Sequence, residues 1–366
     1  MTAQKSFNPF EKSETSIYFG LPDDAYHSVE ALSNSGIKEL LVDPLDFWYQ
    51  SWMNPHRTEK ESSAMLFGKA FHKFVLEGEE EFDNTFVADP LKADHPEALD
   101  TVEDMQSWLR DHELKISGKK AELRDRIKHH DSSVVFWDNL RLELMGERSV
   151  LKQDDIDQIK NRCRIVRAIP SIYNIVKDGC AEVSIFWTEQ SDHGPVRLKA
   201  RTDKLKPNGT IADLKTFQNS QRRKLEDAVS WEIATRKYNL QAAIYRRAVK
   251  SVIDAYKAKK LIVVGAPDGF LDELSKAEHI RFALIFVQNH DAPNAIAREL
   301  REFETLKGLG MSPNAYWRNA EEAWKYAVQK FGRFHKHYGN EPWVEEKAIK
   351  ALTDHDLPMF VQDGMI

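Results

Sequence analysis

Cysteine is scarce in this chain, and apolar runs of membrane length are missing. Only Cys163 and Cys180 occur among the 366 residues. Two thiols are too few for a four-thiolate zinc or iron–sulfur site and do not indicate a disulfide framework. No apolar run approaches the ~20 residues of a membrane helix, and the N-terminal segment lacks the apolar core of a signal peptide. We therefore expect a cytoplasmic protein without a membrane partner.

An excess of basic charge is also lacking. The chain carries 52 Lys and Arg against 58 Asp and Glu, which gives a net charge of -6. Any nucleic-acid contact would therefore have to come from a local patch. A phosphate-loop motif is missing too, which argues against an intrinsic motor. What the chain does contain is enough length and apolar content for one large domain, or for a domain plus a small module.

A predicted hairpin at residues 200–218 carries the most informative cluster of charges. Its first strand ends near Asp203, a Pro-Asn-Gly turn follows, and period-2 alternation puts Asp213 and Lys215 on one face of the second strand. Two carboxylates can hold a hard divalent cation while a nearby lysine orients or deprotonates water for phosphodiester hydrolysis. Mg²⁺ is the natural ion. The alternative is a surface hairpin whose charges face solvent.

Two neighbouring elements are predicted to extend this cluster. Residues 181–188 form a strand that begins near Glu182, and antiparallel pairing would bring this carboxylate beside the charges of the hairpin. A helix beginning near Ser230 follows the hairpin. It contains Gln241 and Tyr245, which are four residues apart and so share one helical face.

Two upstream helices add further candidates. Ser33, Asn34 or Ser35 can cap a helix over residues 36–41, whose free amide groups would favour an anion such as phosphate, although most such caps are purely structural. Residues 62–77 form a strongly periodic helix with His72 among its apolar positions. This histidine is either a metal ligand or catalytic group, or a hydrogen-bonded core residue.

The composition changes sharply between residues 92 and 131, which indicates an inserted module with two short helices. The second helix is basic. Such a run is usually a solvated helix face, yet it also suits contact with duplex phosphates. The candidate DNA-binding residues are Ser117, Gly118, Lys119, Lys120, Arg124, Arg126 and Lys128.

The order helix, extended segment, helix in this module resembles the SAP domain, a small DNA-binding module. Its Ser-Gly-x-Lys-x-x-Leu motif is matched by Ser117, Gly118, Lys120 and Leu123. We therefore predict a main domain built from residues 1–94 and 132–366, with a SAP-like insert at residues 95–131.

Five segments taken in chain order carry a second resemblance: GKAFHKFVLE, AEVSIFW, RTDKL, IADLKT and YNLQAAIY. Together they resemble the RecE exonuclease family, the exodeoxyribonuclease VIII group of phage and prophage recombination nucleases. This family lies within the PD-(D/E)xK superfamily, which also contains lambda exonuclease. The resemblance spans residues 26–290, interrupted by the insert. It implies an α/β nuclease core with a central mixed β-sheet flanked by helices.

The resemblance implies a two-metal site for Mg²⁺, with Mn²⁺ as a substitute. Asp203 and Asp213 would bind metal together with the backbone carbonyl of Leu214. Lys215 would position or activate the attacking water.

The remaining matched residues would complete the active site. The resemblance implies that Glu182 completes the metal shell and that His72 assists the second metal site. Gln241 and Tyr245 would close the active site. The turn at residues 32–35, which contains Ser33 and Ser35, would bind the 5′-terminal phosphate of the substrate.

The implied activity is 5′-to-3′ degradation of one strand of linear duplex DNA, leaving a 3′ single-stranded tail for recombination by strand annealing. The implied partners are duplex DNA ends, a RecT-like or Red-beta-like annealing protein, and further copies of the chain in a ring-shaped homo-oligomer. A phage or prophage gene in a bacterial host would encode it. Two other hypotheses stay open. One is a PD-(D/E)xK endonuclease or helicase-coupled nuclease, and the other is a non-catalytic scaffold that binds DNA through the SAP-like module.

Overall fold

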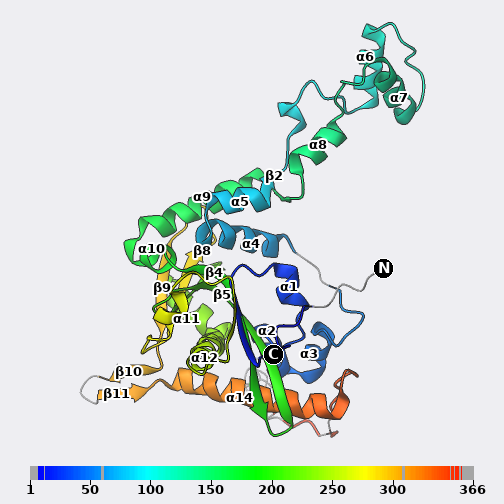
Figure 1. The fold of residues 1–366 in the computed structure, drawn as a ribbon. Helices are drawn as coiled ribbons and strands as arrows, with labels where there is room; N and C mark the ends of the chain where they lie inside the picture. Colours follow the sequence, from blue (N-terminus) through cyan, green and yellow to red (C-terminus); the bar gives the residue numbers. More distant parts are fainter. Residues whose placement is uncertain are drawn as a thin grey trace.

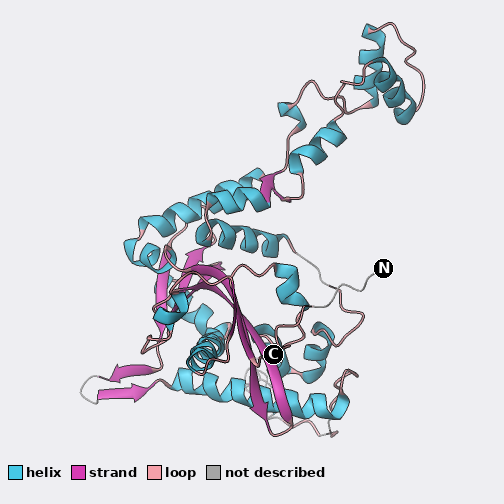
Figure 2. Cartoon of the chain, viewed as in Figure 1, coloured by secondary structure: helices cyan, strands magenta, loops and turns pink. Residues whose placement is uncertain are grey.

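Seven strands form a mixed β-sheet with helices on both faces (Figure 1, Figure 2). The structure is a computed structural model, and it describes residues 7–11, 13–58, 62–306, 310–346, 348–349, 351–353 and 356. Among these residues, no helix has the length and apolar character needed to cross a membrane. The layered arrangement confirms the predicted α/β fold with a central mixed sheet flanked by helices.

The strand order in the sheet is β7-β1-β4-β5-β6-β8-β9. β6 runs parallel to β8 and β1 runs parallel to β7, while the other neighbours are antiparallel. The predicted antiparallel unit therefore exists as β4, β5 and β6 at the centre of the sheet. The strands are β1 (Thr15–Tyr18), β4 (Cys180–Ser191), β5 (Gly194–Leu205), β6 (Thr210–Phe217), β7 (Ile262–Val264), β8 (Arg281–Gln288) and β9 (Ala295–Leu300).

The larger core lies on the sheet face that also carries Asp213. The buried stripe of α14 faces this core, with Trp317, Trp324 and Phe331 spaced seven residues apart, as expected for one face of a helix. The helices on this side are α1 (Asp23–Ser28), α2 (Asn34–Val42), α3 (Pro44–Gln50), α11 (Leu225–Thr235), α12 (Tyr238–Lys257), α13 (Phe270–Leu274) and α14 (Ala315–Tyr338). A two-stranded ribbon, β10 (Phe303–Leu306) with β11 (Gly310–Pro313), precedes α14.

A second core covers the opposite face of the sheet. Because side chains alternate along β6, Ala212 and Leu214 point into this second core, while Ile211 points into the first. Cys163 is buried in the second core, and it and Cys180 are free thiols. The elements on this side are α4 (Ser63–Leu76), α5 (Glu79–Thr85), β2 (Phe86–Ala88), β3 (Ser149–Leu151), α9 (Gln153–Ala168) and α10 (Pro170–Val176).

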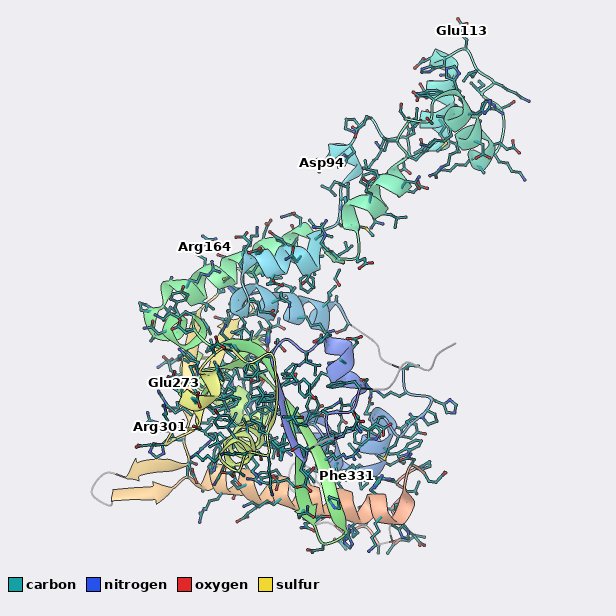
Figure 3. All side chains as sticks on the ribbon, in the orientation of Figure 1. Asp94, Glu113, Arg164, Glu273, Arg301 and Phe331 are labelled. Carbon is teal, nitrogen blue, oxygen red and sulfur yellow. The ribbon has the colours of Figure 1, made fainter. Side chains whose placement is uncertain are left out.

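The inserted module stands away from the sheet as an arm (Figure 1). In Figure 3, Glu113 lies at its tip and Asp94 partway along it, both remote from Phe331 in the body. The arm contains η1 (Lys92–Asp94), α6 (Val102–Asp111), α7 (Lys120–His130) and α8 (Trp137–Met145). It has a core of its own, made of Met105, Leu109, Leu123, Ile127 and Phe136.

The contacts within the inserted module extend past residue 131, its expected end. Phe136 belongs to the arm's core, and Leu99 bridges to it in parallel through hydrogen bonds from Leu99 N to Val135 O and from Trp137 N to Leu99 O, both 2.9 Å. The two chain segments entering and leaving the module therefore lie side by side. The change in composition indicated the basic helix but not the returning segment, residues 132–137. That segment is short, and only its contacts identify it as part of the module.

Candidate active site

The candidate site lies at a fork between β5 and β6. The ladder between these strands ends at the pair Lys204 and Ala212, and the next residues in register are Asp203 and Asp213. From there the two strands diverge. A backbone amide that loses its ladder partner needs another acceptor, and Leu214 N donates to Asp203 Oδ2 at 2.7 Å. Both aspartates thus lie where the two strands separate, and the hydrogen bond from Leu214 N holds the carboxylate of Asp203 in place.

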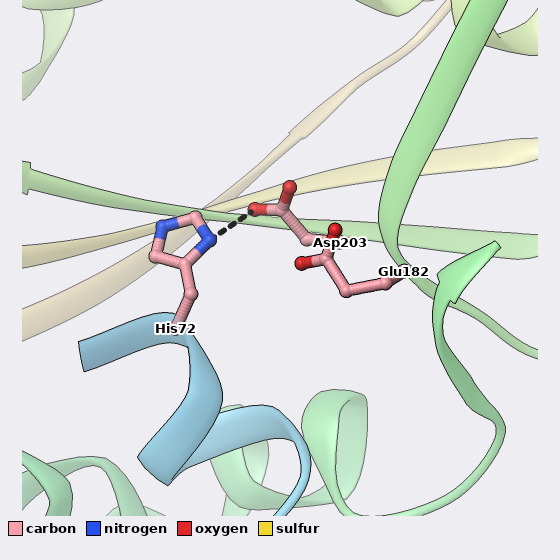
Figure 4. Close-up of side chains that lie close together, drawn as sticks. All are labelled: His72, Glu182 and Asp203. Carbon is pink, nitrogen blue, oxygen red and sulfur yellow. Dashed lines mark ion pairs between the residues drawn. The ribbon is translucent and has the colours of Figure 1, made fainter. Parts of the chain in front are cut away.

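Three possible metal-ligand atoms meet at this fork. One atom each from His72, Glu182 and Asp203 lies within 4.8 Å of the others, and His72 Nδ1 is 3.4 Å from Asp203 Oδ2. Figure 4 shows the imidazole on its helix facing the two carboxylates from the neighbouring strands. The two carboxylates suit a hard divalent cation such as Mg²⁺ or Mn²⁺, whereas the imidazole is a ligand more typical of transition metals. Three of the five predicted metal ligands therefore lie together.

Asp213 lies beside this cluster but has other partners. Its side chain is 0% exposed, and Lys215 Nζ lies 2.6 Å from Oδ2. On the other oxygen, Gln241 Nε2 donates to Oδ1 at 2.6 Å. Among the described residues, the close ligand group does not include Asp213. The carbonyl of Leu214 stays a predicted ligand, since the structure records only the hydrogen bond of its amide.

Helix α12 closes the site from the side of the larger core. Gln241 and Tyr245 lie on one face of this helix, as their spacing predicted, and both are largely enclosed. Burial raises the pKa of Tyr245 well above its ordinary value, so its phenol stays a hydrogen-bond donor. At the start of α12, the ring of Tyr238 lies 5.4 Å from Lys215 Nζ, within reach of a cation–π contact.

Burial shifts the acidic groups of the fork toward their neutral forms. Desolvation, followed by repulsion from Asp203, raises the pKa of Glu182 to about 8. Desolvation also raises the pKa of Asp203 and brings that of Asp213 to about 6, although Lys215 opposes the shift at Asp213. Carboxylates held close together in a dry site repel one another, and a divalent cation would offset that repulsion. Binding of a cation would therefore stabilise the charged carboxylates of this site.

The two basic groups of the fork are shifted in opposite directions. Burial, assisted by the charge of Lys215, lowers the pKa of His72 to about 4, so its imidazole is neutral and can act as a ligand. Burial also lowers the pKa of Lys215, but the carboxylates of Asp213 and Asp203 more than offset this and raise it overall. Lys215 is therefore a firmly held ammonium. This favours its predicted role in positioning water over a role in removing a proton.

Comparison with known proteins agrees with this geometry. A family model described as "PDDEXK-like domain of unknown function (DUF3799)" matches residues 33–266, more than half of the chain. The chain belongs to this PDDEXK-like family. It therefore falls within the PD-(D/E)xK nuclease superfamily.

Two solved structures are similar to the PDDEXK-like chain. A protein from Eubacterium rectale, described as a "Putative exonuclease", is 14% identical with a TM-score of 0.44, over 95% of this chain and 99% of that one. The protein SSO0001 is 11% identical with a TM-score of 0.23, over 73% of this chain and 87% of that one. Neither similarity is high enough to indicate a function. Among curated proteins, none matches significantly.

The backbone at Glu182 departs from ordinary strand geometry. In this PDDEXK-like site its φ is 50°, in the left-handed region, and the ladder between β4 and β5 skips it, although Ala181 and Val183 on either side are paired. A non-glycine residue held there costs about 1–3 kcal/mol and persists only where its surroundings enforce it. In the register of the ladder, Glu182 lies opposite Asp203. Nothing in the sequence around this position indicates the left-handed backbone.

Two cations near the PDDEXK-like site, Arg201 and Lys38, were not among the site residues predicted from the sequence. Arg201 lies 3.9 Å from Glu182, pairs with Asp23 and stacks over the ring of Tyr26 at 4.2 Å. It is two residues before Asp203, so period-2 alternation could have placed it on the same face. Lys38 could not have been found in this way, because it reaches the neighbourhood of Lys215 from α2.

The predicted phosphate-binding turn lines a cavity beside the site. The cavity has a volume of about 630 Å³, and its lining includes Ser33, Ser35, Lys69, Lys199 and Tyr245. Ser33 caps α2 by accepting a hydrogen bond from Gly36 N at 3.2 Å, and the two serine hydroxyls are 2.9 Å apart. The structural role of the cap is therefore present. Phosphate binding by this turn stays a prediction, now with a cavity that has room for a ligand. The ammonium of Lys199 in its wall donates to the carbonyls of Tyr26, His27 and Val29 and so holds the fold.

Some of the basic side chains of α7 hold the arm together. Arg124 pairs with Asp138 and stacks on Phe136 at 4.4 Å. Lys128 donates to the carbonyls of Ser132 and Val134 at 2.9 and 2.8 Å.

The other cations of this helix differ in how firmly they are held. Arg126 donates to the carbonyls of Lys115 and Ser117. Lys120 lies 3.9 Å from Asp100, a long ion pair. Ser117 and Gly118 form the entry to α7, where Gly118 has a φ of 142° and an added Cβ would lie 2.7 Å from Glu122 Oε2. The basic run thus has a structural role at several positions, and its entry, with Lys119, is the part most suited to contact with phosphates.

Proposed function

We propose that this protein is a metal-dependent nuclease that hydrolyses phosphodiester bonds at the fork between β5 and β6. The observation that carries this proposal is the meeting of three ligand atoms next to the buried pair Asp213 and Lys215. Membership of the PDDEXK-like family supports it. Such a pairing of an acidic cation site with a fixed ammonium is what phosphodiester hydrolysis requires.

In this proposal the residues divide the work. His72, Glu182 and Asp203 would hold Mg²⁺ or Mn²⁺, in a two-metal site if Asp213 and the carbonyl of Leu214 also take part. When bound, the cation would supply charge that polarises the phosphate and eases deprotonation of water.

The remaining residues act on the substrate and on the other side chains. Lys215 orients the attacking water and stabilises charge on the phosphate through its ammonium group. Gln241 holds Asp213, and Tyr245 offers a neutral phenol to the cavity beside the site.

The finer proposal is a RecE-like exonuclease that degrades linear duplex DNA from a 5′ end. It is supported by the cavity beside the site, in which the N-terminus of α2 would receive a terminal phosphate. A ring-shaped homo-oligomer, a RecT-like or Red-beta-like annealing partner and a phage or prophage origin belong to the same proposal. They rest on the resemblance in the sequence.

Digestion of linear duplex DNA, labelled separately at its 5′ and 3′ ends, tests this function. We expect Mg²⁺-dependent release of the 5′ label, no reaction in EDTA and no cutting of a closed circular control. Cutting of the circle would instead identify an endonuclease. Binding of DNA without hydrolysis under any divalent metal would contradict the nuclease and favour a scaffold.

We further propose that the arm holds duplex DNA upstream of the site, as a SAP-like module would. Because Leu99 and Phe136 are bridged, residues 99–136 can be replaced by two glycines without a long gap. This deletion should lower processivity about tenfold at physiological salt, because phosphate contacts are lost. Hydrolysis of short duplexes should be unaffected.

A charge-reversal variant with the arm retained separates the role of charge from that of the fold. Lys115 and Lys119 are exposed lysines on either side of the Ser117-Gly118 entry to α7. Lys115→Glu together with Lys119→Glu should reproduce the loss of processivity on long duplexes. Equal processivity of the intact and deleted chains at all salt concentrations would refute the role of the arm.

A further inference from the structure

A second cavity lies just past the catalytic strand β6. It has a volume of about 160 Å³ and is lined by residues of the loop after β6 and of helix α11. Asn219 holds this loop in shape, because its side chain donates to Arg223 O at 2.7 Å and accepts from Arg223 N at 3.0 Å. Arg222, between them, has a φ of 49° and completes the tight turn. The loop is therefore a structured wall.

An exposed tryptophan forms the other wall of this cavity. Trp231 on α11 is 60% exposed, unlike the buried tryptophans of α14. The guanidinium of Arg223 lies 4.3 Å from its ring centre. Gln221 Oε1 fixes that guanidinium by accepting from Nε at 2.9 Å and from Nη2 at 2.6 Å. An aromatic face and a planar cation are thus held together, with the tryptophan open to solvent.

The charge around this pair is locally basic in a chain of net charge -6. Arg222 and Lys224 flank Arg223 before α11, and Arg236 and Lys237 follow the helix; all four of these flanking residues are exposed. Within residues 222–237 these five cations outnumber three carboxylates, of which Glu232 lines the cavity and pairs with Arg236. Aromatic faces set in a cationic groove bind single nucleic-acid strands, since each base has a π-face and each phosphate a charge. The charge complementarity points to a polyanion with planar groups as the occupant of this surface.

The position of the cavity relates it to the catalytic lysine. Its lining begins at Phe217, two residues beyond Lys215 on β6, which is about 6.6 Å along a strand. Nucleotides of one DNA strand are spaced about 3.4 Å along a duplex axis. A strand with its scissile phosphate at Lys215 could therefore present a base to this cavity one to three nucleotides away.

We propose that Trp231 and Arg223 form a stacking platform for an unpaired base of the DNA strand, next to the scissile phosphate. The inference rests on the nuclease function proposed above. Stacking there would stabilise a frayed end, so that one strand is held for cleavage while the other is released. The platform would select by the presence of a base and not by its identity, because stacking does not depend on hydrogen bonds to base edges.

Single abasic sites in the substrate test this platform. The initial cleavage rate of linear duplex DNA in Mg²⁺ is measured with one abasic nucleotide at each position near the labelled end. With the unmodified chain, one position should slow cleavage by about tenfold, within the range expected for a lost stacked base. Trp231→Ala should be slowed to a similar degree on intact DNA and should no longer respond to that abasic site.

Two further variants serve as controls. Trp231→Phe, which keeps an aromatic face, should retain most of the rate and the response to the abasic site. Tyr326→Ala removes another exposed aromatic, 56% exposed on α14, and should behave as the unmodified chain.

Each other outcome has a distinct meaning. A chain that cleaves DNA but tolerates every abasic position equally overturns the platform alone. The same holds if Trp231→Ala is slow yet keeps the response of the unmodified chain, because the residue then acts only through the fold. No cleavage by the unmodified chain would overturn the nuclease function itself.

Discussion

Lys215→Ala is expected to reduce hydrolysis of linear duplex DNA by about 10²- to 10⁴-fold, the range for loss of a positioned catalytic group. The ammonium of Lys215 lies 2.6 Å from Asp213 and faces the ring of Tyr238. Another lysine could take over its role only by moving into this position. Binding of Mn²⁺, measured by calorimetry, should persist because the three clustered ligands remain. Lys257→Ala, at the exposed end of α12, is the matched control and should be fully active.

The same substitution should make stability depend more strongly on pH. Lys215 opposes the rise in the pKa of Asp213, which is about 6 with the lysine present. Without it, that pKa should rise further, so the folded state would hold a proton that the unfolded state loses near its ordinary pKa. Stability is then retained at low pH and lost as pH rises through the folded-state pKa. Thermal melts of Lys215→Ala should show a larger loss of stability, relative to the unmodified chain, at pH 8 than at pH 5.

In the activity assay, a rate of DNA hydrolysis by Lys215→Ala within about threefold of that of the unmodified chain would contradict the role of Lys215.

Glu182→Gln should strongly reduce metal-dependent cleavage and yet stabilise the metal-free protein at alkaline pH. The loss should be about 10²-fold or more, because a neutral amide is a poor ligand for a hard cation. Stability should rise because the pKa of Glu182 is about 8 in the folded protein, against an ordinary value of 4.5. Folding therefore opposes the charged form.

The sign of this effect follows from the two pKa values. Below pH 4.5 the carboxyl is neutral in both states, and the substitution should change little. Between pH 4.5 and about 8 the unfolded state loses this proton while the folded state keeps it, so the stability of the unmodified chain falls over this range, and the amide variant avoids that fall. We expect a gain of about 1 kcal/mol at pH 8.5, a value reduced from the pKa shift because 33% of the side chain is exposed and Arg201 lies nearby.

Thermal melts in EDTA at pH 4.5 and pH 8.5 measure this gain. Glu143→Gln, on the exposed face of α8, is the control and should show no gain at either pH. A variant that is less stable than the unmodified chain at pH 8.5 would show that Glu182 stabilises the fold through its contacts. That result would contradict the interpretation of the fork as a site that costs stability without its cation.

The arm illustrates how far local patterns reach. Helical periodicity identified two of its helices, α6 and α7, because the apolar spacing of Met105 and Leu109, and of Leu123 and Ile127, is a property of each segment alone. The part played by its cations was not visible. Arg124 and Lys128 bind groups on the returning segment, and no pattern within α7 states where that segment lies.

Local patterns in the sequence predicted the strands and helices around the site, except that the helix expected to begin near Ser230 is two helices, α11 and α12, which are separated at Lys237. Strand alternation put Asp213 and Lys215 on one face, and helical spacing did the same for Gln241 and Tyr245, because both periods are fixed by local backbone geometry. Only the tertiary structure decided that β5 and β6 part at Asp203, that Glu182 takes a left-handed backbone, and that Asp213 pairs with Lys215 beside the ligand cluster. These depend on where a ladder ends and on which distant helices pack against it, and such long-range contacts leave no periodic trace in the chain.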